Sequence, residues 1–333
     1  MIQSANVIDA KLALSHLDVE EKQTAITGAS RDFFWYSPVL KSRLDHLVAD
    51  FLVRPKDEAE IIEILRVCYA HDVPVTTRGA GTGNYGQAMP MRGGCLLHLK
   101  HMDKVIHCEP GRVIVQPGCL LKDVDAYCIP ACGHELRMFS STWATATIGG
   151  FIAGGSGGVG SVTWGPLREL GNIIRLRVVT MEQEPRVLEF TGEELARVSH
   201  AYGTNGIITE LELPLAPAYN WIHCFVTSKN WDRAMNCADE LANENGILLK
   251  IASVYEAPTA KAYFQRVAPY VDKEDHLVGL MVAPHSMEAF LTWLNRNSDL
   301  KLLYRSDDHN WARSPGLVFE YGWNHTTLRA LKI

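Results

Sequence analysis

The sequence lacks the patterns that would place the protein in a membrane or on nucleic acid. No apolar run in its 333 residues approaches the roughly 18 residues of a membrane-spanning helix. The first residues have neither the basic nor the apolar region of a secretion signal. The formal net charge of −6 lacks the basic excess of most nucleic-acid binders. We therefore expect a cytoplasmic protein that spans no membrane and binds no nucleic acid.

The eight cysteines also lack a regular framework. No C-x-x-C pair occurs, and no histidine or cysteine pair of ligand spacing follows Cys128 and Cys132. The sequence therefore predicts no metal site and no disulfide framework. We expect these thiols to be small buried hydrophobic groups.

The length and composition predict a packed protein of more than one domain. Hydrophobic residues make up 47% of the chain, and its mean hydropathy is −0.04. Pro214 and Pro217 mark a boundary in the sequence pattern. We predict a helical arm (1–48), a first large domain (49–218), a smaller α+β domain (219–310) and a C-terminal segment (311–333).

Hydrophobic periodicity predicts the elements of these domains. Strands are expected at 51–55, 73–77, 95–99, 112–118, 173–179 and 206–213, and helices at 57–70 and 120–128. Beyond Pro217, extended segments (221–227, 247–255, 276–283, 300–304) alternate with helices (231–242, 259–267, 287–295), which indicates a ferredoxin-like α+β layer. A last strand is expected at 316–321. The helix expected after it reaches the end of the chain without a cap, so the chain is either cut or naturally short there.

A glycine-rich loop, Arg78–Gly86, follows the strand expected at 73–77. Glycine allows positive φ angles and lets backbone N–H groups close around an anion. Arg78 adds a charged donor at the start of the loop. The loop is therefore predicted to hold a phosphate group.

Two well-known phosphate loops do not fit this stretch. Gly81–Gly86 matches G-x-G-x-x-G, but Pro90, Gly93 and Gly94 follow, so no helix opens toward a pyrophosphate as in a Rossmann fold. Gln87 and Ala88 stand where a P-loop has Lys-Ser/Thr. A second glycine-rich stretch, Gly149–Gly165, also carries Phe151, Ile152 and Trp164, which is unusual for a solvent-exposed linker.

Five ordered motifs give the chain a resemblance to a family. They are Val53–Glu60, Pro74–Gly83, Gln116–Gly118, Thr147–Gly165 and Tyr202–Glu210. Together they resemble the FAD-binding domain of the vanillyl-alcohol oxidase / p-cresol methylhydroxylase (PCMH) type, found in FAD-linked oxidases. The resemblance covers about residues 49–218 and is nearest to the glycolate and D-lactate dehydrogenase branch. It implies an α+β fold in which two α+β subdomains hold FAD, followed by the cap at 219–310.

The resemblance also implies which residues bind FAD. The first loop would wrap the pyrophosphate, the Pro-Gly pair would lie near the adenosine, the second glycine stretch would line the ribityl chain and flavin, and a later strand would offer backbone contacts. In order, these residues are Arg78, Gly79, Ala80, Gly81, Thr82, Gly83, Asn84, Tyr85, Gln87, Pro117, Gly118, Ser140, Ser141, Thr142, Ala146, Thr147, Gly149, Gly150, Ala153, Gly154, Gly157, Gly158, Ser161, Trp164, Gly206, Ile207 and Ile208.

Two of these positions carry further expectations. Many relatives attach flavin covalently to a histidine at the place of Thr82, so the resemblance implies noncovalent FAD here. Trp164 stands where the family often has a tyrosine near the flavin ring, and structural packing is the alternative role.

The catalytic groups would come from the cap and from the C-terminal segment that returns toward the flavin. Our candidates are Tyr321, His325 and Arg329, with Asn324 beside them, because polar and aromatic side chains crowd this stretch. A helix start capped by Asn324 or Thr326 explains the same residues. Second choices, flanking the flavin loops, are His134, Glu135, Arg137 and Arg168.

Two functions fit the sequence. The first is an FAD-dependent oxidoreductase, dehydrogenase or oxidase, that takes a hydride from a small alcohol or 2-hydroxy acid. The His-x-Gly-Asp-Gly-Asn motif typical of the 2-hydroxy-acid branch is absent, so other alcohols stay open as substrates. The second is a flavin-binding accessory subunit or non-catalytic relic that depends on a partner chain. A homo-oligomer is an open possibility in either case.

Overall fold

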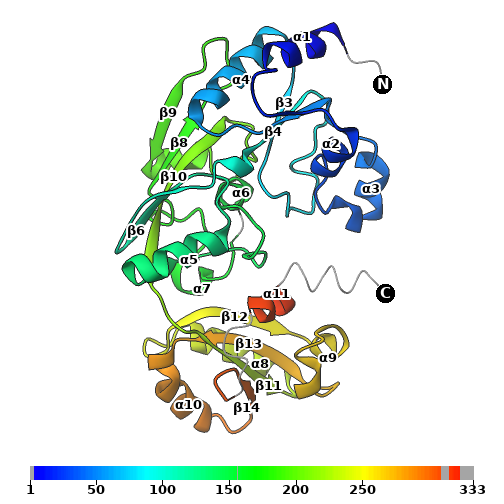
Figure 1. The fold of residues 1–333 in the computed structure, drawn as a ribbon. Coiled ribbons are helices and arrows are strands. Elements are labelled where there is room, and N and C mark those ends of the chain that lie inside the picture. The colour runs from blue at the N-terminus through cyan, green and yellow to red at the C-terminus, as the bar shows by residue number, and fades with distance from the viewer. Residues whose placement is uncertain (1–3, 156, 309–314, 323–333) are drawn as a thin grey trace. The chain divides into compact units, whose positions relative to one another are not determined.

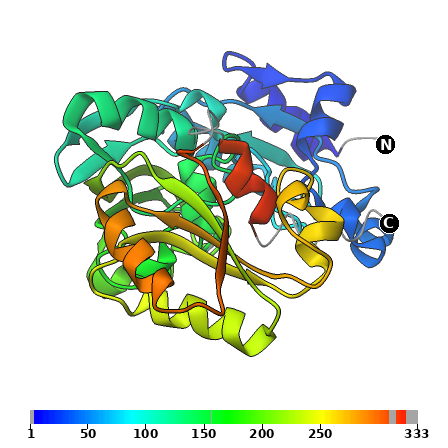
Figure 2. The ribbon, with the colours of Figure 1, turned by 90° about the horizontal axis from the view of Figure 1, so that it is seen from below.

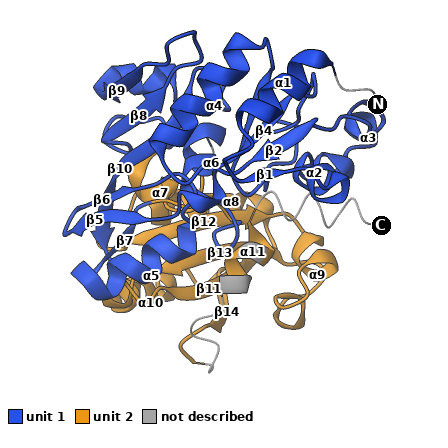
Figure 3. Ribbon diagram, turned by 45° about the horizontal axis from the view of Figure 1, so that its top comes forward, with its two compact units in different colours: residues 1–137, 142–156, 167–217 blue, residues 138–141, 157–166, 218–333 orange. Residues whose placement is uncertain are grey.

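The structure is a computed structural model that describes residues 4–155, 157–308 and 315–322. It divides into two compact units (Figure 3). Unit 1 comprises residues 1–137, 142–156 and 167–217, and unit 2 comprises residues 138–141, 157–166 and 218–333. None of the helices within the described ranges is both long and apolar enough to cross a membrane.

The first sheet of unit 1 has four strands in the order β1-β2-β4-β3 (Figure 1). Strands β2, β4 and β3 are parallel, and β1 is antiparallel to β2. This sheet and its helices are built from α1 (Ala5–Ala13), β1 (Val19–Glu20), α2 (Gln23–Ala29), η1 (Phe34–Tyr36), α3 (Pro38–Leu44), β2 (Phe51–Val53), α4 (Glu58–Ala70), β3 (Val75–Arg78), β4 (Cys95–His98) and η2 (Leu99–His101). The predicted strands near residues 51, 73 and 95 and the predicted helix at 57–70 are confirmed.

Helix α4 is well specified by its sequence. The Asp57 side chain caps its N-terminus by accepting a hydrogen bond from the Glu60 N–H at 3.0 Å. Ile61, Ile64 and Leu65 recur at helical spacing and are fully buried. Burying such side chains stabilises the fold by roughly 1.5–3 kcal/mol each. They join a core that includes residues of α1, β2, β4, β8 and β10.

The second sheet of unit 1 is antiparallel, with the order β5-β6-β10-β8-β9 and with β7 paired to β10. Its long central strand, β10, pairs with β6, β7 and β8 along its length. The elements are β5 (Val105–Glu109), β6 (Arg112–Val115), α5 (Leu121–Cys132), β7 (His134–Leu136), α6 (Ile148–Gly154), β8 (Arg175–Val179), β9 (Val187–Thr191), η3 (Gly192–Arg197) and β10 (Ile207–Pro217).

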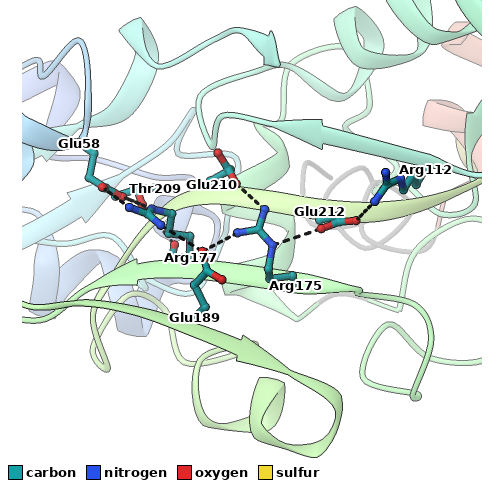
Figure 4. A network of polar contacts seen from close by, with 8 residues as sticks. All are labelled: Glu58, Arg112, Arg175, Arg177, Glu189, Thr209, Glu210 and Glu212. Atoms are coloured by element: carbon teal, nitrogen blue, oxygen red, sulfur yellow. Dashed lines mark hydrogen bonds and ion pairs between the residues drawn. The ribbon is translucent and has the colours of Figure 1, made fainter. Parts of the chain in front are cut away.

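A network of charged side chains joins α4 to this second sheet (Figure 4). Arg177 on β8 donates two hydrogen bonds to the Glu58 carboxylate, at 2.8 and 2.9 Å, and a third to Glu189 at 3.0 Å. Thr209 on β10 donates to the same Glu58 carboxylate at 2.7 Å. These bonds connect the element that covers the first sheet to two strands of the second.

Unit 2 contains one antiparallel sheet, in the order β12-β13-β11-β14. Helices α8 and α10 contribute to the core on one face, and α9 and α11 contribute to the core on the other (Figure 2). The elements are α7 (Ser161–Trp164), β11 (Ile222–Ser228), α8 (Trp231–Ala242), β12 (Leu249–Tyr255), α9 (Thr259–Tyr263), η4 (Ala268–Tyr270), β13 (His276–Val282), η5 (Pro284–Ser286), α10 (Met287–Asn295), β14 (Lys301–Arg305) and α11 (Pro315–Tyr321). Apart from α9, this is the β-α-β-β-α-β element order expected of a ferredoxin-like layer.

The strand predicted at 316–321 is wrong, because these residues form α11. Leu317, Val318 and Tyr321 are all buried, at relative positions i, i+1 and i+4. That spacing places them on one side of a helix and not on one face of a strand. Pro315 at the first helical position is also typical of a helix start.

We predict that Glu58→Gln lowers the free energy of unfolding by about 1–2 kcal/mol at pH 7, because it weakens the paired bonds with Arg177. The Arg177 side chain holds the pKa of Glu58 below its ordinary value. The stability that this lowered pKa adds is therefore present above the ordinary carboxyl pKa and is lost in more acid solution. Urea unfolding of wild type and variant should differ at pH 7 and converge as the pH falls below about 4.

The matched control for this prediction is Glu184→Gln. Glu184 also pairs with an arginine, Arg66, but its side chain is 79% exposed. Its removal should change the free energy of unfolding by less than about 0.5 kcal/mol. Equal unfolding curves for wild type and Glu58→Gln at pH 7 would contradict the account.

Candidate functional site

The predicted phosphate loop leaves β3 at Arg78, where the strand pairs with His98 of β4. Gly81 and Gly86 adopt φ angles of 68° and 79°, which L-residues with a side chain rarely adopt. The loop is half-buried from Gly79 to Asn84, and Tyr85 is exposed. The glycines predicted to shape this loop therefore do so at two positions.

The guanidinium of Arg78 lies inside the loop. It is 8% exposed, and it donates to the carbonyl oxygens of Arg31 at 2.6 Å and Ala80 at 3.4 Å. A Cβ atom at Gly81 would lie 2.2 Å from its Nη2 atom. The arginine thus connects the loop to the N-terminal segment, and Gly81 leaves the space that it fills. Burial and this positive charge lower the pKa of the adjacent His98 to about 4, so that histidine is neutral at pH 7.

Asp32 is a part of this site that the sequence did not reveal. It is 5% exposed, and its two oxygens accept hydrogen bonds from the N–H groups of Phe34 at 2.7 Å and Gly86 at 2.9 Å. The Phe33 N–H donates to the Gly83 carbonyl at 2.8 Å. Asp32 lies more than 40 positions before the loop, and neither a motif nor a residue spacing links it to the loop. The sequence therefore gives no signal for its role.

The backbone of the loop presents a row of amide groups with no acceptor. The Gln87 side chain accepts from the Tyr85 N–H at 3.0 Å, and Asp32 accepts from Gly86. By contrast, the amides of Ala80 to Asn84 donate no hydrogen bond to any residue that the structure describes. Half-buried amides without an acceptor are costly unless a ligand or water satisfies them. Five consecutive ones fit a multiply charged anion such as a pyrophosphate.

Close backbone approaches bring other predicted segments next to this loop. A Cβ atom at Gly79 would lie 2.2 Å from the Thr147 hydroxyl oxygen, and one at Gly149 would lie 2.8 Å from the Pro117 carbonyl oxygen. A Cβ atom at Gly203 would lie 3.3 Å from Thr77. The loop, the Pro-Gly pair, the start of α6 and the segment before β10 are therefore neighbours within unit 1.

The backbone N–H groups at the start of α6 already have acceptors within the protein. The Thr147 hydroxyl accepts from the Gly150 N–H, and the N–H groups of Ile148 and Gly149 donate to the carbonyls of Cys119 and Pro117. These N–H groups of α6 are therefore not open donors, and the open donors of the site are amides of the Arg78–Gly86 loop. Downstream, Ala153 and Gly154 complete the helix, and the Ala153 carbonyl accepts from the Tyr202 N–H.

Helix α5 supports the segment Thr142–Ala146. The Leu121 N–H donates to the Ala146 carbonyl, and Asp125 accepts from the Trp143 indole N–H at 2.7 Å. Asp125 also accepts from the Leu136 N–H, which ties the same helix to β7. Gly206, with a φ of 124°, Ile207 and Ile208 lead into β10, where the two isoleucines pair with β8 and are buried.

Six predicted flavin residues belong to unit 2: Ser140, Ser141, Gly157, Gly158, Ser161 and Trp164. Phe139 and Val159 form a bridge that joins the two short segments carrying them. The Ser161 hydroxyl donates to the Gly158 carbonyl at 2.8 Å, and Trp164 is half-buried in α7. At the end of α11, a Cβ atom at Gly322 would lie 2.7 Å from the Ser141 Cβ. Gly322, which follows α11, and Ser141 are thus neighbours within this unit.

Of the predicted catalytic residues, only Tyr321 lies within the described part of the chain. His325 and Arg329, with Asn324, lie outside it. The Tyr321 side chain is fully buried, and its hydroxyl bonds to Nδ1 of His223 at 2.8 Å. Burial raises the pKa of Tyr321 well above 10 and lowers the pKa of His223 to about 4. At pH 7 both groups are neutral, and one hydrogen bond joins the phenol oxygen to Nδ1 of the imidazole.

The second-choice residues lie elsewhere. His134 and Glu135 are in β7, where the His134 ring contacts the Cys132 carbonyl, and Arg137 donates to the Gly171 carbonyl. Arg168 is exposed. No group of His, Cys, Asp or Glu side chains in the described ranges could hold a metal ion. All eight cysteines are free, although the Sγ atoms of Cys108 and Cys132 lie only 3.2 Å apart.

Comparisons with known proteins agree with this geometry. Residues 49–187 match the family described as FAD binding domain. A glycolate oxidase subunit GlcD from Bacillus subtilis (strain 168) is 31% identical over 180 residues, which is 50% of this chain and 37% of the relative. The mitochondrial D-lactate dehydrogenase (cytochrome) of Arabidopsis thaliana is 26% identical over 274 residues, which is 73% of this chain and 47% of the relative.

Among solved structures, an alkyldihydroxyacetonephosphate synthase has the same fold. Its TM-score is 0.74 over 96% of this chain and 64% of that chain, at 14% sequence identity. The matched stretches span less than half the length of these two curated relatives. Residues 49–187 of the chain thus carry a segment that matches an FAD-binding domain, and the similarity of this part of the chain to a glycolate oxidase subunit supports FAD as its cofactor.

Proposed function

We propose that the protein oxidises a small alcohol or 2-hydroxy acid by transferring a hydride to noncovalently bound FAD. The names of two relatives support the substrate class, since one is a glycolate oxidase subunit and the other a D-lactate dehydrogenase. Both of those substrates are 2-hydroxy acids. Thr82, in place of the histidine to which many family members attach their flavin, supports a noncovalent cofactor.

The observation that carries this proposal is the row of open amides from Ala80 to Asn84. A pyrophosphate diester has about two negative charges, which five amides would satisfy beside the buried Arg78 guanidinium. Thr147 adjoins this loop at Gly79, and Pro117 in turn adjoins Gly149. In this proposal they extend the cradle toward the rest of the cofactor.

When bound, FAD would supply the hydride acceptor. The chain's own residues would bind and orient the cofactor and substrate. Tyr321 is protonated at neutral pH, because burial raises its pKa, and so it would act there as a hydrogen-bond donor and not as a base. We propose His325 and Arg329 as the groups that would take a proton and hold an acidic substrate, from the same sequence segment.

A second candidate is an accessory flavin-binding subunit. One observation favours it: the Bacillus subtilis relative is itself named as a subunit. In this case the chain would hold FAD, and a partner chain would complete the site for the substrate.

A panel of substrates under anaerobic conditions separates the two candidates. Glycolate, D-lactate and small primary alcohols are added to the FAD-loaded protein. The absorbance of the oxidised flavin is followed in its visible band, at about 450 nm. We expect at least one of these compounds to bleach the band. An unchanged band with every compound, in a protein that holds FAD, would favour the accessory subunit.

The mode of FAD attachment is tested by denaturation. We expect acid or heat to release all yellow colour into the filtrate of a size-exclusion filter, because no covalent bond holds the flavin. The filtrate and the retained protein are compared by absorbance. Colour that stays with the denatured polypeptide would show a covalent bond.

Gly81→Ala tests the placement of the pyrophosphate. The added Cβ atom would lie 2.2 Å from the Arg78 guanidinium, at a φ of 68° that costs an L-residue about 1–2 kcal/mol. We expect FAD affinity to fall at least tenfold, measured by quenching of flavin fluorescence. Gly28→Ala is the control, because its Cβ atom would meet nothing within 4 Å. Equal FAD affinity in both variants would contradict the placement.

A further inference from the structure

Asp32 lies outside residues 49–187, the segment that matches the FAD-binding family, yet its carboxylate is buried against the phosphate loop. We propose that Asp32 is a positioning residue of the FAD site: by holding the Gly83–Gly86 turn it keeps the Ala80–Asn84 amides directed toward the pyrophosphate. This inference rests on the proposed FAD-binding role of the loop. It adds the N-terminal segment Arg31–Phe34 to the cofactor site.

The hydrogen bonds around Asp32 support this role. One carboxylate oxygen accepts from the Phe34 N–H and the other from the Gly86 N–H, at 2.7 and 2.9 Å. The Phe33 N–H donates to the Gly83 carbonyl at 2.8 Å, and the Arg78 guanidinium donates to the Arg31 carbonyl at 2.6 Å. Three of these bonds thus connect the consecutive residues Arg31, Asp32 and Phe33 to both ends of the loop, and the bond from Phe34 fixes the Asp32 carboxylate within the N-terminal segment.

These contacts divide the loop amides into two groups. Asp32 and Gln87 accept from the amides of Gly86 and Tyr85, at the end of the loop. The amides of Ala80 to Asn84 have no acceptor among the described residues. Unpaired amides can turn back toward the protein unless the flanking backbone is held, and preorganised donors bind an anion without that cost.

A carboxylate is suited to this position because it accepts on both oxygens. An asparagine at 32 would accept on one atom only, and its NH₂ group would face the second backbone N–H. The negative charge of the Asp32 carboxylate would repel a pyrophosphate, but the positive charge of the nearby Arg78 attracts that carboxylate and offsets the repulsion. Burial raises the pKa of Asp32, and the Phe34 and Gly86 amides together with Arg78 oppose that rise.

The test compares Asp32→Asn with Asp50→Asn in the full chain. Asp50 is a matched control because its carboxylate also accepts from a glycine N–H, that of Gly94 at 2.6 Å, in a turn outside the phosphate loop. FAD is removed, and the protein is titrated with FAD by fluorescence quenching. We expect Asp32→Asn to bind FAD about 10-fold to 100-fold more weakly than wild type, the loss of one charge-assisted hydrogen bond. Asp50→Asn should bind as wild type does.

Amide hydrogen exchange distinguishes positioning from a general loss of structure. In FAD-free Asp32→Asn, we expect faster exchange at the Phe34 amide, at the Gly86 amide and at the loop amides that precede Gly86. The amides of β2, β3 and β4 should stay protected as in wild type. Faster exchange throughout these strands, or unchanged FAD affinity in the folded variant, would overturn the proposal.

If Asp32→Asn does not fold, amide exchange in the wild-type protein tests the same role. In the FAD-free wild-type protein, the Gly86 amide should exchange more slowly than those of Ala80 to Asn84, since it alone of these six has an acceptor. Equal exchange at all six would overturn the role of Asp32. A wild-type protein that binds no FAD at all would instead refute the proposed function, so the two failures are distinct.

Discussion

The structure of the site depends on one constraint: five consecutive half-buried residues, Ala80 to Asn84, have amides without an acceptor in the described chain. A fold tolerates this arrangement only if the surrounding residues hold the loop in place. Arg78 and Asp32 do so with buried charged groups, and Gly81 provides the space for the guanidinium. In the proposed function, a bound pyrophosphate would accept the hydrogen bonds that these amides leave open.

The remainder of unit 1 brings other segments to this loop. The parallel strands β2, β4 and β3 direct Arg78 toward the N-terminal segment, and α4 joins that sheet to the antiparallel one through Glu58 and Arg177. Glycine is needed where Gly79 meets Thr147 and Gly149 meets Pro117, because a side chain at either position would collide with its neighbour. The packing of unit 1 and these glycines thus bring the segments together at the same site.

The sequence was sufficient for much of this account. Hydrophobic periodicity located α4 and most strands of both units, although it missed β1, β5 and β7. The order of glycine motifs identified the FAD-binding domain. Sequence could not reveal Asp32 or His223, because each acts through tertiary contacts with residues 54 and 98 positions away. The prediction at 316–321 failed because a short apolar segment fits a strand and a helix equally well until its buried side is known.

The central claim is that this chain binds FAD through the Arg78–Gly86 loop. The most direct measurement is the visible spectrum of the purified protein after incubation with FAD and removal of unbound cofactor. The account predicts the two absorption bands of an oxidised flavin, at about one FAD per chain. A folded protein that retains no flavin absorbance after this treatment would contradict it.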